Sequence, residues 1–203
     1  MIKTIIFDIG NVLADFNFEG CFKHYTSDED TYHKMVQATV MSPVWNEFDK
    51  GVWSDEEILQ GFIHNDVSIE KQLRNMFTDL KDIIKQRDYA IPWIQELKQE
   101  GYQVLILSNF PKKIYEIHRE KELKFLEVVD GGILSYRERL VKPDPAIYYL
   151  LMNRYHLLPT ECLFMDDREE NVLAARKVGW KAILFTTKEK AIEEIEVITK
   201  QVR

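Results

Sequence analysis

Five short apolar runs along the chain predict buried β-strands. They span Thr4–Phe7, Val104–Leu107, Gly132–Leu134, Cys162–Met165 and Ala182–Phe185. Segments with helical spacing and end signals follow most of these runs, and they predict helices over Ile91 to Glu100, Pro145 to about Tyr155, Glu169 to about Val178 and Lys188 to about Val202. Strands that alternate with helices indicate an α/β fold, with a Rossmann-like parallel sheet that helices cover on both faces.

The stretch from about Phe16 to Asp88 interrupts this alternation. It shows helical periodicity, many charges and several aromatic residues, and no convincing strand. We therefore predict an α/β core formed by residues 1–15 and 89–203, with residues 16–88 inserted as a helical cap. An insertion at that point would lie over the carboxyl ends of the strands, where ligands bind in such sheets.

Composition and charge narrow the classes of partner. Hydrophobic residues make up 45% of the 203 positions, and 27 basic against 34 acidic side chains give a formal net charge of −7. An acidic chain with scattered basic residues argues against nucleic-acid and membrane binding. We expect a cytoplasmic protein, because no run approaches the roughly 18 apolar residues of a membrane span and Asp8 interrupts the N-terminal apolar run. The oligomeric state is left open.

Polar residues follow three of the predicted strands directly. Asp8 ends the first, Ser108-Asn109 the second and Asp166-Asp167 the fourth. Because the carboxyl ends of parallel strands lie at one edge of the sheet, these side chains should meet there. Lys142, before Pro143 in the loop after the third strand, is a candidate to join them.

Each of these residues has a chemical and a structural interpretation. Asp8 could attack phosphorus as a nucleophile, or it could be a turn or cap residue. Ser108 and Asn109 could donate hydrogen bonds to a phosphoryl group, or cap a helix ahead of Pro111. Lys142 could neutralise the transferring group, or be a solvated surface lysine.

The adjacent pair Asp166-Asp167 is harder to explain structurally, because two carboxylates at the end of an apolar strand repel each other. They could cap the helix that begins near Glu169. They could instead hold a divalent cation, with Mg²⁺ favoured by carboxylate oxygens. Asn171, one helical turn later, could orient a carboxylate or a metal-bound water.

In this order, the four segments resemble the four motifs of the haloacid dehalogenase superfamily. The segments are Phe7-Asp8-Ile9-Gly10-Asn11-Val12, Leu107-Ser108-Asn109, Val141-Lys142-Pro143 and Phe164-Met165-Asp166-Asp167-Arg168-Glu169-Glu170-Asn171. The predicted insert resembles the type-1 helical cap of subfamily I. The form of the first motif is similar to a branch that includes glucose-1-phosphate phosphatases and the phosphatase domain of soluble epoxide hydrolase.

The resemblance implies a Mg²⁺-dependent phosphomonoesterase that acts on a small phosphorylated metabolite, such as a sugar phosphate, through an aspartyl-phosphate intermediate. Asp8 would be the nucleophile and a metal ligand, together with the Gly10 carbonyl and Asp167. Asp166 would be a further ligand or would hold one in place. Substrate binding would fall to Ser108, Asn109, Lys142 and Asn11, with Ser108 and Lys142 also taking part in catalysis.

Gly10 departs from the family pattern. Superfamily phosphatases usually carry an aspartate there as the acid that protonates the leaving group, a function worth about 10²–10⁴-fold in rate. Asp15 could substitute, as could Asp49 or His24 of the cap. Alternatively, the substrate could have a good leaving group, such as an anomeric, acyl or aryl phosphate. We favour the last explanation as a hypothesis.

The cap segment Trp45–Ser54 allows two interpretations. Its Gly51–Ser54 portion looks like the cap loop of the same branch and would help to choose the substrate. It could equally be a corner between two helices, packed by Trp45 and Trp53, with Ser54 capping a helix that begins at Asp55.

Other activities remain open. A non-catalytic phosphate sensor would explain Gly10, although a binding protein needs no nucleophile. A phosphomutase requires the acid–base group that Gly10 lacks. A dehalogenase shares the fold, but the Asp166-Asp167 pair favours a metal that the related dehalogenase chemistry does not use.

Overall fold

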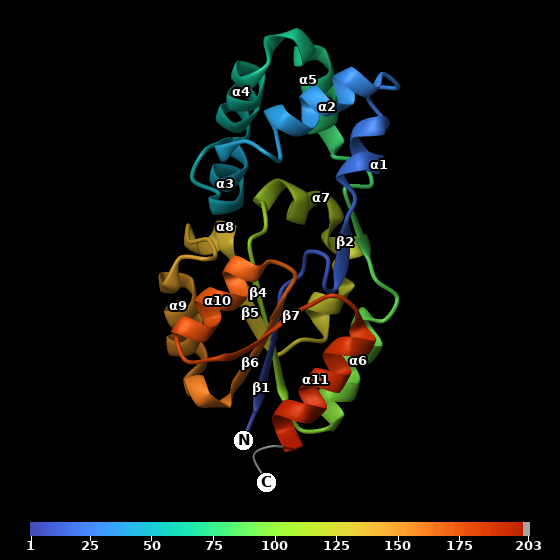
Figure 1. Cartoon of the computed structure of the whole chain (residues 1–203). Coiled ribbons are helices and arrows are strands. Elements are labelled where there is room, and N and C mark those ends of the chain that lie inside the picture. Colours follow the sequence, from blue (N-terminus) through green and yellow to red (C-terminus); the bar gives the residue numbers. More distant parts are fainter. Residues whose placement is uncertain (201–203) are drawn as a thin grey trace.

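The computed structural model describes residues 1–200. Its core is a five-stranded sheet of order β5-β4-β1-β6-β7, parallel throughout (Figure 1). The strands are β1 (Thr4–Phe7), β4 (Gln103–Ser108), β5 (Gly131–Leu134), β6 (Cys162–Asp166) and β7 (Lys181–Leu184). All five predicted strands are present, and each end lies within one residue of the prediction. The predicted α/β fold with a parallel sheet is confirmed.

Helices cover both faces of this sheet, as the near-continuous burial of its strands requires. On one face, α6 (Ala90–Gln99) and α11 (Lys188–Lys200) pack with Ile5 and Phe7 of β1. On the other face, α9 (Pro145–Tyr155) and α10 (Glu169–Lys177) pack with Ile6. The four predicted helices are therefore present; the expected continuation of the last one to Val202 lies outside the described residues.

Four further helical segments of the core had no apolar pattern that predicted them. They are α7 (Lys112–Glu122), α8 (Ser135–Glu138) and two short 3₁₀ helices, η2 (Lys124–Glu127) and η3 (Pro159–Glu161). Helix α7 buries a single side chain, Ile114. A helix with so few buried positions lacks the periodic stripe on which a prediction depends.

Five helices form a layer beyond the carboxyl ends of the sheet strands (Figure 1). They are α1 (Phe18–Lys23), α2 (Glu29–Ala38), α3 (Pro43–Lys50), α4 (Asp55–Asn65) and α5 (Glu70–Asp79), with the 3₁₀ turn η1 (Val67–Ile69). Phe48, Phe62 and Phe77 pack edge to face or tilted at their centre. Ser54 begins α4 through a reciprocal capping box with Glu57, as predicted. None of the described helices is long and apolar enough to cross a bilayer.

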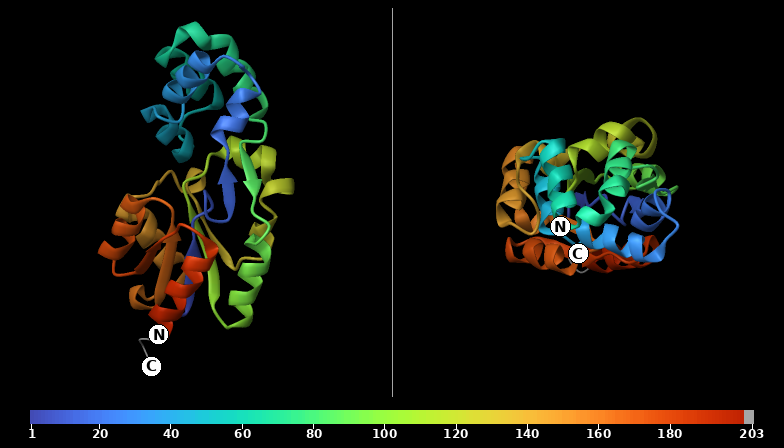
Figure 2. Two further views of the ribbon diagram at one scale, coloured as in Figure 1. Left: turned by 45° about the vertical axis from the view of Figure 1, so that its right-hand side comes forward. Right: turned by 90° about the horizontal axis from the view of Figure 1, so that it is seen from above.

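A two-stranded antiparallel ribbon lies between the sheet and the five helices (Figure 2). It pairs β2 (Ala14–Phe16) with β3 (Ile84–Gln86), so the expectation that no strand lies between Phe16 and Asp88 was wrong. Three residues are too few to show an alternating pattern, and β3 is defined by its partner. We propose that the ribbon is the link between the core and a cap of residues 16–88.

Candidate active site

Three charged side chains from different segments meet beyond the end of β1. The ammonium of Lys142 lies 2.9 Å from Asp8 Oδ1 and 2.6 Å from Asp166 Oδ2. All three residues are at most 7% exposed. Asp8 is held at the strand end by its amide, which donates to the Met165 carbonyl of β6. The parallel register of β1 and β6 thus brings together the residues that the sequence placed at one edge.

Asp166 is fully occupied by neighbouring donors. Its oxygens accept hydrogen bonds from Lys142 Nζ, from Asn171 Nδ2 and from the Arg168 amide. Helix α10 has its N-cap at Arg168 and no side-chain cap, so capping by the acidic pair does not occur at that position. Asp166 therefore fixes Lys142 and the start of the loop that follows β6.

Asp167 forms a different contact from that of Asp166. Its Oδ2 accepts a hydrogen bond from Asn11 Nδ2 at 2.8 Å. Asn11 adopts a left-handed backbone, with φ of 54°, a conformation that asparagine tolerates better than most residues. The turn after β1 therefore positions Asp167 through Asn11.

Asn109 clamps the backbone of the lysine loop. Its side chain donates to the Lys142 carbonyl at 2.9 Å and accepts from the Lys142 amide at 2.7 Å. Both the NH2 group and the carbonyl oxygen of the Asn109 side chain therefore contact the backbone of Lys142. Ser108 is buried, and Pro111, not Ser108 or Asn109, is the N-cap of α7. The helix-capping interpretation of this pair is not what the structure shows.

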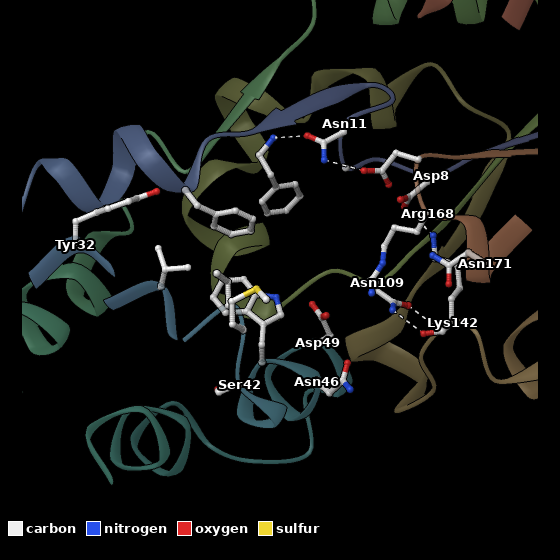
Figure 3. Close-up of a pocket in the computed structure, with 18 residues that line it drawn as sticks. Asp8, Asn11, Tyr32, Ser42, Asn46, Asp49, Asn109, Lys142, Arg168 and Asn171 are labelled. Atoms are coloured by element: carbon white, nitrogen blue, oxygen red, sulfur yellow. Dashed lines mark hydrogen bonds and ion pairs between the residues drawn. The ribbon is translucent and has the colours of Figure 1, made fainter. Parts of the chain in front are cut away.

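A cavity of about 620 Å³ opens between these residues and the helices above them. Asp8, Lys142, Asp167, Gly10, Asn11 and Asn109 all line it, whereas Ser108 and Asp166 do not. Figure 3 shows Asp8, Asn109, Lys142 and Asn171 grouped on one side of it, and Tyr32 on the other. The residues predicted to act together thus share one space, with Ser108 and Asp166 behind its wall.

Burial governs the titration of this group. It raises the pKa of Asp8 to about 7, with Lys142 opposing the rise and Asp166 adding to it. Burial also raises the pKa of Asp167. The ammonium of Lys142 is disfavoured by burial, but attraction to Asp166 and Asp8 outweighs this and raises its pKa. Perturbed pKa values that are gathered in one cavity are typical of functional sites.

The acidic residues fit a divalent cation. Asp8, Asp166 and Asp167 each offer an oxygen, and these oxygens lie within 4.8 Å of one another. Asp8 Oδ1 is buried and lies 2.9 Å from the Lys142 ammonium, without a hydrogen bond of normal geometry. Three carboxylate oxygens this close together suit Mg²⁺, which binds hard oxygen ligands. Because Asp166 is already occupied by donors, Asp8 and Asp167 are the more available ligands.

Of the three residues that could replace the acid missing at position 10, one lines the cavity. Asp15 is half-exposed and pairs with Arg87 at 2.6 Å, outside the cavity. His24 pairs with Asp82 and is also outside it. Asp49 of α3 lines the cavity and is 7% exposed.

The cap segment divides into two parts. Trp45, Asn46 and Asp49 line the cavity, whereas Gly51–Ser54 do not. Trp45 packs against Phe18 and Phe48, as the structural interpretation of this corner expects, whereas Trp53, its other expected packing residue, is 41% exposed. A direct role of Gly51–Ser54 in choosing the substrate stays a prediction.

Solved structures show what this fold resembles. A haloacid dehalogenase family enzyme from Bacteroides thetaiotaomicron, in complex with magnesium and inorganic phosphate, superposes with a TM-score of 0.74 at 20% identity, covering 93% of this chain and 96% of its own. At this identity the likeness concerns the fold.

Curated relatives are similarly distant. The sesquiterpene phosphatase astK of Aspergillus oryzae is 24% identical over 184 residues, which cover 91% of this chain and 90% of the relative. The D-ribitol-5-phosphate phosphatase of B. thetaiotaomicron is 23% identical over 198 residues, covering 89% and 90%. The chain spans less than two thirds of the length of several other relatives.

The family model for haloacid dehalogenase-like hydrolases matches residues 2–179. This match includes Asp8, Lys142 and the Asp166-Asp167 pair, the residues on which the resemblance in the sequence depends. The chain therefore belongs to the haloacid dehalogenase-like hydrolase family.

Proposed function

We propose that the protein is a Mg²⁺-dependent phosphomonoesterase for a small phosphorylated metabolite. The observation that carries this proposal is the convergence of Asp8, Lys142 and Asp167 on one cavity. Similarity to two curated phosphatases and to a fold relative with bound magnesium and phosphate supports it. The substrates named for the two phosphatases, and the magnesium and phosphate bound in that structure, are properties of those proteins.

In this mechanism Asp8 is the nucleophile. One of its carboxylate oxygens attacks phosphorus, the bond to the leaving alcohol breaks, and an aspartyl phosphate forms on Asp8. Lys142, 2.9 Å from Asp8, neutralises charge on the carboxylate and on the incoming phosphoryl group. Water then attacks the aspartyl phosphate and releases inorganic phosphate.

The metal would be held by Asp8, Asp167 and the Gly10 carbonyl. When bound, Mg²⁺ would offset the negative charge of the phosphoryl group and favour the ionised form of Asp8. Asp166 acts from behind the cavity wall, because its hydrogen bonds to Lys142 and Asn171 set the position of the ammonium. Asn109 does the same through the backbone of Lys142.

The test is a hydrolysis assay with p-nitrophenyl phosphate and a panel of phosphorylated metabolites, in the presence of Mg²⁺ or of a chelator. We expect turnover that requires Mg²⁺ and that disappears in Asp8→Asn. Asp15→Asn is the matched control, because it removes a carboxylate outside the cavity. Phosphate binding without turnover of any ester would contradict the proposal and favour a phosphate sensor.

A further inference from the structure

Residue 10, where relatives are expected to carry an acid, is crowded by a neighbouring ring. A Cβ built on Gly10 would lie 3.2 and 3.3 Å from two atoms of the Phe16 ring. A side chain at this position would require the ring to shift by a few tenths of an ångström. Because Gly10 offers no acid, a leaving alcohol that needs a proton must receive it from another residue.

Asp49 enters the same cavity from the opposite side. Figure 3 shows its side chain reaching from α3 into the space between the cap helices and the side that carries Asp8 and Asn109. The residue is 7% exposed, and no described residue forms a hydrogen bond or an ion pair with its carboxyl group. A largely buried acidic residue without a partner is costly for stability, which points to a function.

Burial favours the protonated form of Asp49. Burial raises its pKa to about 8, the negative charge of Asp8 adds to the rise, and Lys142 and Arg168 oppose it. At neutral pH the group therefore holds a proton that it can give away. A general acid works best when its pKa lies near the working pH.

The backbone of Asp49 is fixed to the core. Ser135 Oγ of α8 donates to the Asp49 carbonyl at 2.6 Å and accepts from the Phe110 amide at 2.8 Å. Phe110 follows Asn109, so a single hydroxyl connects α3 of the cap to the loop that carries an active-site residue. The position of Asp49 relative to Asp8 is therefore set by the core as well as by the cap.

We propose that Asp49 is the general acid and base of this enzyme, an inference that rests on the proposed phosphatase function. In the first step Asp8 attacks phosphorus, the P–O bond to the alcohol breaks, and Asp49 gives its proton to the departing oxygen. In the second step water attacks phosphorus, its proton passes to the Asp49 carboxylate, and the bond from phosphorus to Asp8 breaks. Asp49 ends protonated again.

The experiment compares two esters in wild type and Asp49→Asn. p-Nitrophenyl phosphate releases an acidic phenol that needs little protonation, whereas 2-phenylethyl phosphate releases a weakly acidic alcohol that needs it. The ratio kcat/KM is the appropriate measure, because it ends at release of the alcohol and excludes hydrolysis of the aspartyl phosphate. We expect Asp49→Asn to lower it by about 10²–10⁴-fold for the phenylethyl ester and by less than about tenfold for the nitrophenyl ester.

Controls separate this role from a structural one. Asp15→Asn should leave the ratio of the two rates unchanged, and Asp49→Glu should recover part of the phenylethyl activity. In wild type, kcat/KM for the phenylethyl ester should fall at high pH as Asp49 loses its proton beside Asp8, Lys142 and Arg168. This fall should be absent with the nitrophenyl ester.

Each failure has a distinct meaning. If wild type hydrolyses neither ester, the proposed function itself fails. If wild type hydrolyses both but Asp49→Asn slows them equally or not at all, only the assignment of Asp49 is overturned. Should the variant fail to fold, the wild-type pH profiles decide, because equal profiles for the two esters exclude a general acid that acts on the alcohol.

A second, independent observation concerns the part of the cavity away from Asp8. Its lining is mainly apolar: Phe16 of β2, Phe18 of α1, Val36 of α2, Val40 and Met41 after α2, and Trp45 of α3. Four of the charged lining residues, Asp8, Lys142, Asp167 and Arg168, belong to the core, and the fifth, Asp49, comes from α3.

Few polar groups in the apolar part could recognise a sugar. The hydroxyls available there are those of Tyr32 and Ser42, and Ser42 already donates to the Thr39 carbonyl. A sugar has several hydroxyls, each of which would lose its water on entering. An alcohol with a hydrocarbon or aromatic body would instead gain from burial against these side chains.

We infer, on the basis of the same proposed function, that the substrate is a phosphate monoester of an apolar alcohol. This can be tested with linear alkyl phosphates of increasing length beside glucose 1-phosphate and ribose 5-phosphate. We expect kcat/KM to rise about threefold to fourfold per methylene while the chain fills the cavity. Val36→Thr should flatten this rise, and Val67→Thr, at an exposed position outside the cavity, should leave it unchanged. Higher kcat/KM for the sugar phosphates than for all alkyl esters would overturn this inference and leave the phosphatase function intact.

Discussion

Replacing Asp49 by asparagine should make the protein more stable while it removes the proposed acid. The asparagine has the same size as a protonated aspartic acid and cannot ionise. In wild type, the folded state holds the Asp49 pKa at about 8, against an ordinary value of 3.8, mainly through burial. Unfolding therefore releases a proton over the whole range between these values, and this favours the unfolded state of wild type as pH rises.

The size of the effect follows from the two pKa values. At about 1.4 kcal/mol per pKa unit, the raised pKa of Asp49 lowers the unfolding free energy of wild type by about 4 kcal/mol at pH 7 and by about 6 kcal/mol above pH 8. Below pH 4 the cost disappears, because the group is protonated in both states. Since domains are stable by about 5–15 kcal/mol, this is a large share of the total.

Urea unfolding of wild type and Asp49→Asn between pH 3.5 and 9, with a chelator present, measures this difference. The excess stability of the variant should be smallest near pH 4, should grow with pH and should level off above pH 8. Asp28→Asn is the control, because hydrogen bonds to Thr31 lower the pKa of Asp28 at the exposed start of α2. Its stability difference has the opposite sign and changes only at acidic pH. A constant difference for Asp49→Asn from pH 5 to 8 would refute the reasoning.

The remaining predictions concern the cation and the lysine. Asp167→Asn should weaken Mg²⁺ binding in calorimetry without lowering the urea stability of the metal-free protein at neutral pH, because burial raises the pKa of Asp167; unchanged affinity would exclude Asp167 as a ligand. Asn11→Gly keeps the left-handed turn accessible but removes the hydrogen bond to Asp167, so Mg²⁺ affinity should fall about 10–100-fold. Lys142→Met leaves Asp8 and Asp166 buried without their shared cation, so it should reduce the unfolding free energy by about 3–5 kcal/mol, and a loss below 1 kcal/mol would contradict the buried ion-pair network.

The sheet could be predicted from sequence because its strands are buried on both faces. Runs such as Thr4–Phe7 are entirely buried, so their apolar character leaves little choice of position. The elements that escaped prediction carry little such signal. Strand β3 has three residues and exists through its pairing with β2, and α7 buries only Ile114. Local sequence does not encode a pairing with a partner some seventy residues away.

The residues that gather at the site could be predicted from the sequence, but the contacts that each of them forms could not. The ends of parallel strands bring Asp8 and the Asp166-Asp167 pair together in any fold of this class. Which of the pair faces the cavity depends on hydrogen bonds to Asn171 and Asn11, which only the folded turns create. In the same way Asn109, which the sequence predicts to hold the substrate, also binds the backbone amide and carbonyl of Lys142, a contact that the sequence does not indicate.

The sequence could not decide which candidate acid lies in the cavity, because the position of Asp49 relative to Asp8 depends on contacts between cap and core. Helix α3 ends at Gly51 in a left-handed conformation, with φ of 65°. A Cβ there would lie 2.9 Å from the Cβ of Tyr136 in α8. A larger residue at this position would push α3 away from the core and move Asp49 with it. The sequence predicts Gly51 as part of a loop that chooses the substrate; its close approach to Tyr136 shows that it lets α3 pack against α8, and the proposed role of Asp49 depends on this packing.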